Sequence, residues 1–388
     1  MFSGHGFAQS QLQNCAEQFI GGSISNAPTL TDSPSDQPFG NNQHLCYRVK
    51  GASFFALEYE PENFAPRWAA YKLSPENYGD KGCSTYTRTT ANCYIRAETW
   101  SEFLTCTESR DPFHADHLIT GDRLRPADFG NSGHDNGHVA PRQAFSWHAC
   151  GNYQTFSMAN MSPQSALLNQ DIWVKLEQQV LTWAVDHGPL YVVTGTTFGK
   201  FPHEHFQVYR DRILDPKHLY PSGSRMGDVA EQHHAHFKNT DAGHILRPKR
   251  NANPKKLQKR ASNMKIPTGY FAVIYRPETG EEPAHAIAFL LPHTFENLSL
   301  LEKRIEGMAK GRSFWAFVSR IALVEQTSGV QFPGIPPEMK RGWGDEWFLK
   351  RAGSREIRAK DCGQGKPQGV RENSTRQERL TACVPVLH

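Results

Sequence analysis

Long apolar runs are scarce in this 388-residue chain. The longest of them, Ala286 to Pro292 and Leu190 to Val193, have the length of β-strands, whereas a membrane helix needs about 18 apolar residues. The sequence therefore predicts no membrane-spanning segment. It also shows no internal repeat, which argues against a repeat architecture. The 31 glycines and 25 prolines are typical of a globular domain rich in turns.

Cysteine motifs for metal or redox chemistry are missing as well. The eight cysteines form no CxxC pair, which argues against a zinc ribbon or a thioredoxin-like site, and there is no HExxH motif. An even number at wide spacing suits disulfides in an oxidising compartment, with scattered buried thiols of a cytosolic protein as the alternative. Chain order alone suggests the pairs Cys15–Cys46 and Cys362–Cys383.

The N-terminus lacks a charged segment followed by an apolar one, so no secretory signal is visible. The chain is then either cytosolic or a protein whose signal has been removed and replaced by an initiator Met. The cysteine content favours the second interpretation and predicts a secreted or periplasmic protein.

Acidic residues are absent from one short basic stretch. Lysine and arginine crowd residues 249–260, which include Lys255 and Lys256, while the whole chain has a net charge of only +4. Taken alone, such a block is usually a solvated loop. It is also compatible with a nucleic-acid partner, because lysines along a phosphate backbone strengthen binding without regard to base sequence.

Hydrophobic patterning divides the chain into three parts. Residues 1–44 are loop-rich, residues 45–334 carry the strand and helix patterns, and residues 335–388 form a polar C-terminal extension. Within the central part we expect strands near 46–49, 54–59, 67–73, 190–195, 269–275 and 284–290, a helix over 162–186, another apolar element at 314–325, and a polar insertion rich in His and Lys at about 199–262.

A histidine, an asparagine and a glutamate carry the chemistry. His138 follows a glycine and is suited to accept a proton from water near neutral pH. Asn169 lies on the predicted helix and offers a neutral oxygen ligand to Mg²⁺, which keeps most of its waters. Glu177 lies about two turns further and roughly 80° around the helix, where it can orient the metal's waters. Each residue alone is more often structural or solvated; their order and spacing favour phosphodiester hydrolysis.

Three segments in this order resemble the signature of the DNA/RNA non-specific endonucleases, the ββα-metal superfamily that includes the Serratia-type nuclease. They are Asp135 to Pro141, Asn160 to Gln164 and Asn169 to Glu177. The similarity extends over about residues 45–334 apart from the insertion. It implies an α+β fold of the ββα-metal nuclease type, in which helices flank a central antiparallel sheet.

The resemblance also implies roles for individual residues. His138 activates the attacking water, Asn169 binds a single Mg²⁺, Glu177 positions the metal's waters, and Asn160 supports the site through hydrogen bonds. Mn²⁺ or Ca²⁺ are alternatives to Mg²⁺. The substrates are DNA and RNA, cut without sequence preference to leave 5′ phosphates, and no membrane is involved.

One residue departs from the family pattern, because Asn136 replaces the arginine of the family's Asp-Arg-Gly-His motif. Arginine contacts phosphate and stabilises charge near the transition state, whereas asparagine donates a hydrogen bond without a charge. Three interpretations are open: lower activity, compensation by Arg110 or Arg142, or a changed substrate preference. Because the base and the metal ligand remain, we expect an active enzyme with Asn136 still in the catalytic site.

Substrate contacts are expected from several further side chains. The candidates are Arg110, Arg142, Gln164, Lys255 and Lys256. The histidines of the insertion have no metal-binding spacing, so a solvated or structural loop is the better interpretation for them.

Two other classes of function fit the same residues. A nucleic-acid-binding protein, catalytically weakened by Asn136, would retain its partner without cutting it. A phosphodiesterase for small substrates would prefer a model diester to plasmid DNA, but the basic stretch argues modestly against it, since a small substrate needs no long positive track.

Overall fold

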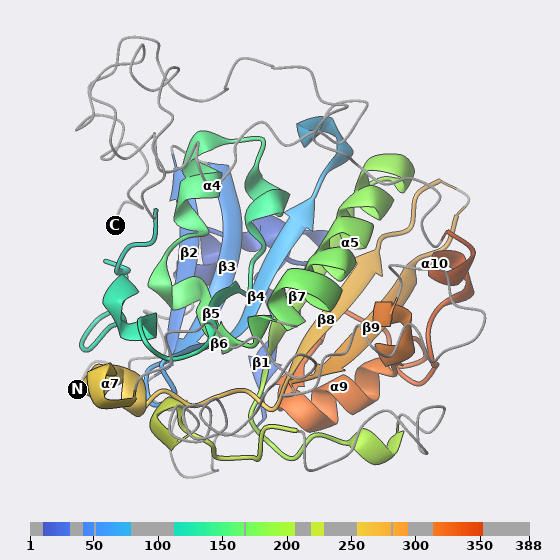
Figure 1. Ribbon diagram of the computed structural model, residues 1–388. Helices are drawn as coiled ribbons and strands as arrows, with labels where there is room; N and C mark the ends of the chain where they lie inside the picture. Colours follow the sequence, from blue (N-terminus) through green and yellow to red (C-terminus); the bar gives the residue numbers. More distant parts are fainter. Residues whose placement is uncertain are drawn as a thin grey trace, which may run out of the picture.

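The computed structural model describes residues 11–31, 42–49, 52–78, 112–166, 168–205, 219–228, 254–280, 282–293 and 313–351. At its centre is a seven-stranded antiparallel sheet in the order β10-β9-β8-β7-β4-β3-β2 (Figure 1). Its strands are β2 (Gln43–Val49), β3 (Ala52–Glu60), β4 (Ala65–Leu73), β7 (Leu190–Thr197), β8 (Gly269–Arg276), β9 (His285–Pro292) and β10 (Val318–Ser319).

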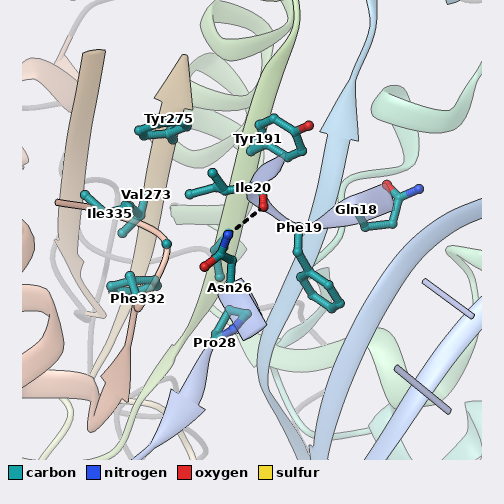
Figure 2. A pocket seen from close by; sticks show the side chains of 12 residues that line it. Gln18, Phe19, Ile20, Asn26, Pro28, Tyr191, Val273, Tyr275, Phe332 and Ile335 are labelled. Atoms are coloured by element: carbon teal, nitrogen blue, oxygen red, sulfur yellow. Dashed lines mark hydrogen bonds between the residues drawn. The ribbon is translucent and has the colours of Figure 1, made fainter. Parts of the chain in front are cut away.

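The central strands are buried on both faces, which explains their nearly continuous apolar sequences. Successive residues of a strand point to opposite faces. On β7, Thr194 donates a hydrogen bond to Val139 O at 2.6 Å, whereas Tyr191 and Val193 line a small pocket on the other face. The N-terminal segment closes that pocket with Phe19 and neighbouring residues (Figure 2). The pocket therefore lies away from the candidate active site.

A smaller hairpin and a long helix lie on the Thr194 side of the sheet. The hairpin pairs β5 (Asp135–His138) with β6 (Met161–Gln164), and β6 leads into a π-helical turn, η8 (Leu168–Trp173), that continues as α5 (Val174–His187). Figure 1 shows α5 running across the sheet. The hairpin and helix together form the ββα unit that the sequence predicts.

The helix begins later than expected. We predicted it over 162–186, but Ser162 to Gln164 belong to β6 and pair with β5, so the helix starts at Leu168. The apolar positions Leu176, Val180 and Leu181 are buried as their spacing predicts. The predicted apolar element at 314–325 is in fact three short elements, η13 (Ser313–Phe317), β10 and α9 (Ile321–Ser328).

Short elements complete the described structure. They are β1 (Thr29–Leu30), paired with β11 (Val330–Gln331), and η1 (Ala16–Gln18), η2 (Ile20–Gly22), η3 (Ile24–Asn26), η4 (Pro75–Asn77), η5 (Pro126–Phe129), η6 (Arg142–Phe145), α4 (Ala149–Gln154), η7 (Met158–Asn160), η9 (His203–His205), η12 (Pro254–Lys256), α7 (Lys259–Ser262) and α10 (Glu346–Lys350).

Parts of the predicted insertion and of the predicted C-terminal extension pack against the rest of the domain. Tyr220 and Met226 of the insertion are buried in an apolar cluster that also contains Met161 of β6. From the C-terminal side, α10 packs on α5, because the rings of Phe348 and Trp183 lie 4.9 Å apart and Trp183 Nε1 donates to Arg351 O at 2.8 Å. The described portions of both segments are thus continuous with the domain.

The predicted disulfide between Cys15 and Cys46 is confirmed and ties the N-terminal segment to β2. Cys150 is disulfide-bonded too. The predicted Cys362–Cys383 pair lies outside the described residues. Within the described ranges, no helix has the length and apolar character required to cross a bilayer.

Candidate active site

The register of the hairpin sorts the motif residues into two faces. Asp135 and Gly137 are buried, whereas Asn136 and His138 are partly exposed, as alternation along a strand requires. The side chain of Gln164 lies across Gly137, where an added Cβ would come within 2.3 Å of Gln164 Oε1. A glycine is therefore required before the histidine for a steric reason in this hairpin.

Asp135 joins the hairpin to the first turn of the helix. Its Oδ2 accepts hydrogen bonds from Asn169 Nδ2 at 3.0 Å and from Gln170 Nε2 at 2.6 Å. A carboxylate can only accept, so the amide of Asn169 must present its nitrogen to Asp135. Its oxygen, the atom that a cation takes, stays outside this hydrogen bond. Asp135 was not among the site residues predicted from the sequence, although its place in the motif was the available signal.

Asn160 anchors the segment that follows His138. Its Oδ1 accepts from Ala140 N at 2.8 Å, its Nδ2 donates to Ala140 O and Thr155 O at 2.9 Å each, and its carbonyl accepts from Val139 N at 3.0 Å. The side chain is fully buried. Truncating it would leave three backbone groups without these partners beside the histidine.

The imidazole of His138 packs against two phenyl rings that also contact each other. The centroid of Phe156 is 5.1 Å from it in an edge-on arrangement, and that of Phe113 is 5.8 Å away. These rings restrict the rotation of the imidazole and give it apolar walls. His138 is thereby held on the partly exposed face of β5 that it shares with Asn136.

Glu177 is a partly buried acid on the same helix as Asn169. Burial raises the pKa of Glu177 to about 8, although the nearby charge of Arg142 opposes this rise. A cation beside this carboxyl group would lower its pKa, because a positive charge in addition to that of Arg142 would favour the ionised form. Arg142 lies on η6, which follows β5, and so reaches the site from the hairpin side.

The other predicted substrate contacts differ in burial and in charge pairing. Gln164 is fully buried, which gives no support to a direct contact with a substrate. That contact stays a prediction. Lys255 and Lys256 are exposed on η12. The neighbouring Arg260 is held by Asp122 and Asp128, with N–O distances of 2.8 and 3.5 Å, so one charge of the basic stretch is neutralised. Arg110 lies outside the described residues.

The donor set fits a magnesium ion. Asn169 Oδ1 and the Glu177 carboxylate are oxygen donors on one helix, and Mg²⁺ prefers oxygen ligands while keeping several waters. Within the described ranges there is no group of three or more His, Cys, Asp or Glu side chains placed to hold a metal ion.

His134, directly before the motif, is expected to make stability depend on pH. Burial, assisted by the neighbouring His293, lowers the pKa of His134 from 6.5 to about 3. At pH values between about 3 and 6.5, His134 is protonated in the unfolded chain but not in the folded chain. The free energy of unfolding should therefore fall with pH below about 6.5, by up to about 1.4 kcal/mol per pH unit from this residue.

Denaturant unfolding of wild type and His134→Gln between pH 7 and 4 measures this effect. We expect a shallower pH slope in the variant. Equal slopes would mean that His134 becomes protonated in the folded protein.

Comparison with known proteins identifies the class of protein to which this ββα unit belongs. The model of the DNA/RNA non-specific endonuclease family matches residues 38–332. The chain belongs to this family, which confirms the resemblance seen in the sequence and the predicted fold class. The nucleases of this family depend on divalent metal ions.

Individual relatives are distant. Human mitochondrial endonuclease G is 25% identical over 180 residues, which cover 45% of this chain and 53% of that protein. A nuclease from Nostoc sp. is 30% identical over 131 residues, or 32% of this chain and 47% of that protein. The chain thus spans about half the length of the curated relatives it matches. A crystal structure of an EndoG/EndoGI complex aligns with 75% of this chain and 88% of its own, at 19% identity and a TM-score of 0.44.

Proposed function

We propose that this chain is a Mg²⁺-dependent endonuclease that cuts DNA and RNA without sequence preference and leaves 5′ phosphates, with Mn²⁺ or Ca²⁺ as alternative ions. The observation that carries the proposal is the pair of hydrogen bonds from Asn169 and Gln170 to Asp135. They orient the amide of Asn169, a neutral ligand suited to an ion whose remaining positions are filled by water and phosphate.

The residues of the chain divide the reaction between them. His138 accepts a proton as a water oxygen attacks phosphorus and the bond to the 3′ oxygen breaks, while the 3′ oxygen takes up a proton from solvent. Asn169 and Glu177 would hold the ion and its waters, and Asn160 keeps the His138 segment in place. Bound Mg²⁺ would supply positive charge to the phosphate and the departing oxygen.

Arg142 is our candidate for the charge that Asn136 lacks. Its charge partly offsets the rise in the pKa of Glu177, which supports a position close to Glu177 at the edge of the site. Lys255 and Lys256 are proposed to extend the positive surface along the nucleic-acid backbone. The Cys15–Cys46 disulfide supports a secreted or periplasmic location.

Digestion of supercoiled plasmid and of a structured RNA tests this proposal. With Mg²⁺ we expect both to be degraded, EDTA to stop the reaction, and the new ends to accept a 5′ label only after dephosphorylation. Asn169→Ala should lower the rate by about 100-fold or more, because it removes the proposed protein ligand of the ion. Gln178→Ala, exposed on the same helix, is the control.

The outcomes separate the candidate functions. Retarded but uncut nucleic acid would favour a binding protein weakened at Asn136. A faster reaction with a model diester than with plasmid would favour a small-substrate phosphodiesterase.

A further inference from the structure

His293 is a fully buried histidine with two hydrogen bonds of opposite polarity. It follows β9, and its Nδ1 lies 2.8 Å from Pro267 O while its Nε2 lies 2.8 Å from Ser165 N. A carbonyl oxygen can only accept and a backbone N–H can only donate. The ring must therefore be neutral, with its proton on Nδ1 and an acceptor at Nε2.

Ser165 is the junction between the hairpin and the metal-binding helix. It follows Gln164 at the end of β6, and its carbonyl accepts from Leu168 N at 3.0 Å and from Asn169 N at 2.9 Å. The peptide that His293 holds through Ser165 N is thus one residue away from the carbonyl that holds Asn169. A shift of this junction would move Asn169 relative to Asp135.

The other side of His293 is fixed to the sheet. Its backbone N–H donates to Thr268 O at 2.9 Å, next to β8, and the ring of Tyr220 stacks on its imidazole with centroids 4.1 Å apart. Tyr270 of β8 adds a parallel link, because its hydroxyl donates to Pro163 O at 2.7 Å. Side chains from the ends of β8 and β9 thereby hold the end of β6.

We infer that His293 is a positioning residue for the metal site, which tethers Ser165 to the sheet so that Asn169 keeps its geometry. The inference rests on the proposed role of Asn169 as metal ligand. Without the acceptor at Nε2, the amide of Ser165 would be left buried and unpaired, at a cost that the start of the helix can avoid only by moving.

Two substitutions separate the hydrogen bonds of His293. His293→Gln carries an amide oxygen at about the reach of Nε2 and keeps an acceptor for Ser165. His293→Asn reaches only as far as Nδ1 and keeps only the donor for Pro267. Both replace the imidazole ring by an amide, so the packing of Tyr220 against the ring is lost in both. The difference between them therefore reports the tether to Ser165.

The measurements are the Mg²⁺ concentration at half-maximal plasmid cleavage and the deuterium exchange of amides 165–173. We expect His293→Asn to raise that Mg²⁺ concentration by about ten-fold or more and to speed exchange at this junction, and His293→Gln to stay close to wild type in both. A spectrum of the imidazole nitrogens should show the proton on Nδ1 in wild type.

The control is His148→Gln, because His148 also accepts backbone N–H groups, at the start of α4. It should lower the melting temperature without changing the Mg²⁺ requirement. Equal behaviour of His293→Gln and His293→Asn would overturn the inference and reduce His293 to packing. If wild type cleaves nothing, the proposed function fails, while the exchange data still decide whether His293 holds the junction.

Discussion

His138→Ala is expected to lower the rate of Mg²⁺-dependent plasmid cleavage by about 10²–10⁴-fold, the usual contribution of a positioned general base. The imidazole is the proposed proton acceptor, on the partly exposed face of β5 that it shares with Asn136, and its contacts with Phe113 and Phe156 restrict its rotation. The loss should fall on kcat, because His138 is proposed to act on the attacking water more than on bound phosphate.

Initial rates at several DNA concentrations separate kcat from KM, and gel retardation with EDTA reports binding. We expect the variant to bind DNA as wild type does and to melt within a few degrees of it, because the side chain is partly exposed. A variant that still cleaves at the wild-type rate would remove His138 from the mechanism and direct attention to another base.

Glu177→Gln is expected to impair the enzyme and to stabilise the metal-free protein. Burial raises the pKa of Glu177 from 4.5 to about 8. Between these values the unfolded chain releases a proton that the folded chain retains, so native stability falls as pH rises from about 4.5 to about 8. Glutamine removes this penalty. At pH 8 the variant should unfold with a free energy on the order of 2 kcal/mol above wild type, after a discount for partial exposure.

Chemical denaturation in EDTA at pH 4 and pH 8 measures the effect, with the low-pH pair as the internal control. The two proteins should differ little at pH 4 and clearly at pH 8. Cleavage with Mg²⁺ should fall by about ten-fold or more in the variant, as substitutions around a metal ion usually cause. Equal stability at pH 8 would show that Glu177 is already ionised in the metal-free fold.

The choice of residues in these two predictions comes from the sequence, whereas the pKa shift in the second comes from the folded structure. His138, Asn169 and Glu177 were proposed as site residues from the sequence, because a histidine after glycine and two oxygen donors on one helix are local patterns. The raised pKa of Glu177 was not predictable, because desolvation by surrounding segments and the charge of Arg142 arise only after the chain has folded.

The start of the helix that carries Asn169 shows the same division. Apolar spacing correctly predicted the buried face of α5, since that periodicity is a property of consecutive residues. The same spacing wrongly placed the helix start at 162. Ser162 to Gln164 form a strand because they pair with β5, about 25 residues earlier in the chain, and the spacing of apolar residues does not show that pairing.

By itself, then, the sequence determined the family, the ββα unit and the candidate base and metal ligand, whereas the Cys15–Cys46 pair was only suggested by chain order and was shown by the structure. Only the tertiary structure decided that Asp135 orients the amide of Asn169, that Gln164 is buried over Gly137, and that His293 holds Ser165. Each of these contacts joins residues that are far apart in sequence or on different elements. Their hydrogen bonds and burial depend on strand register and packing, which no local pattern encodes.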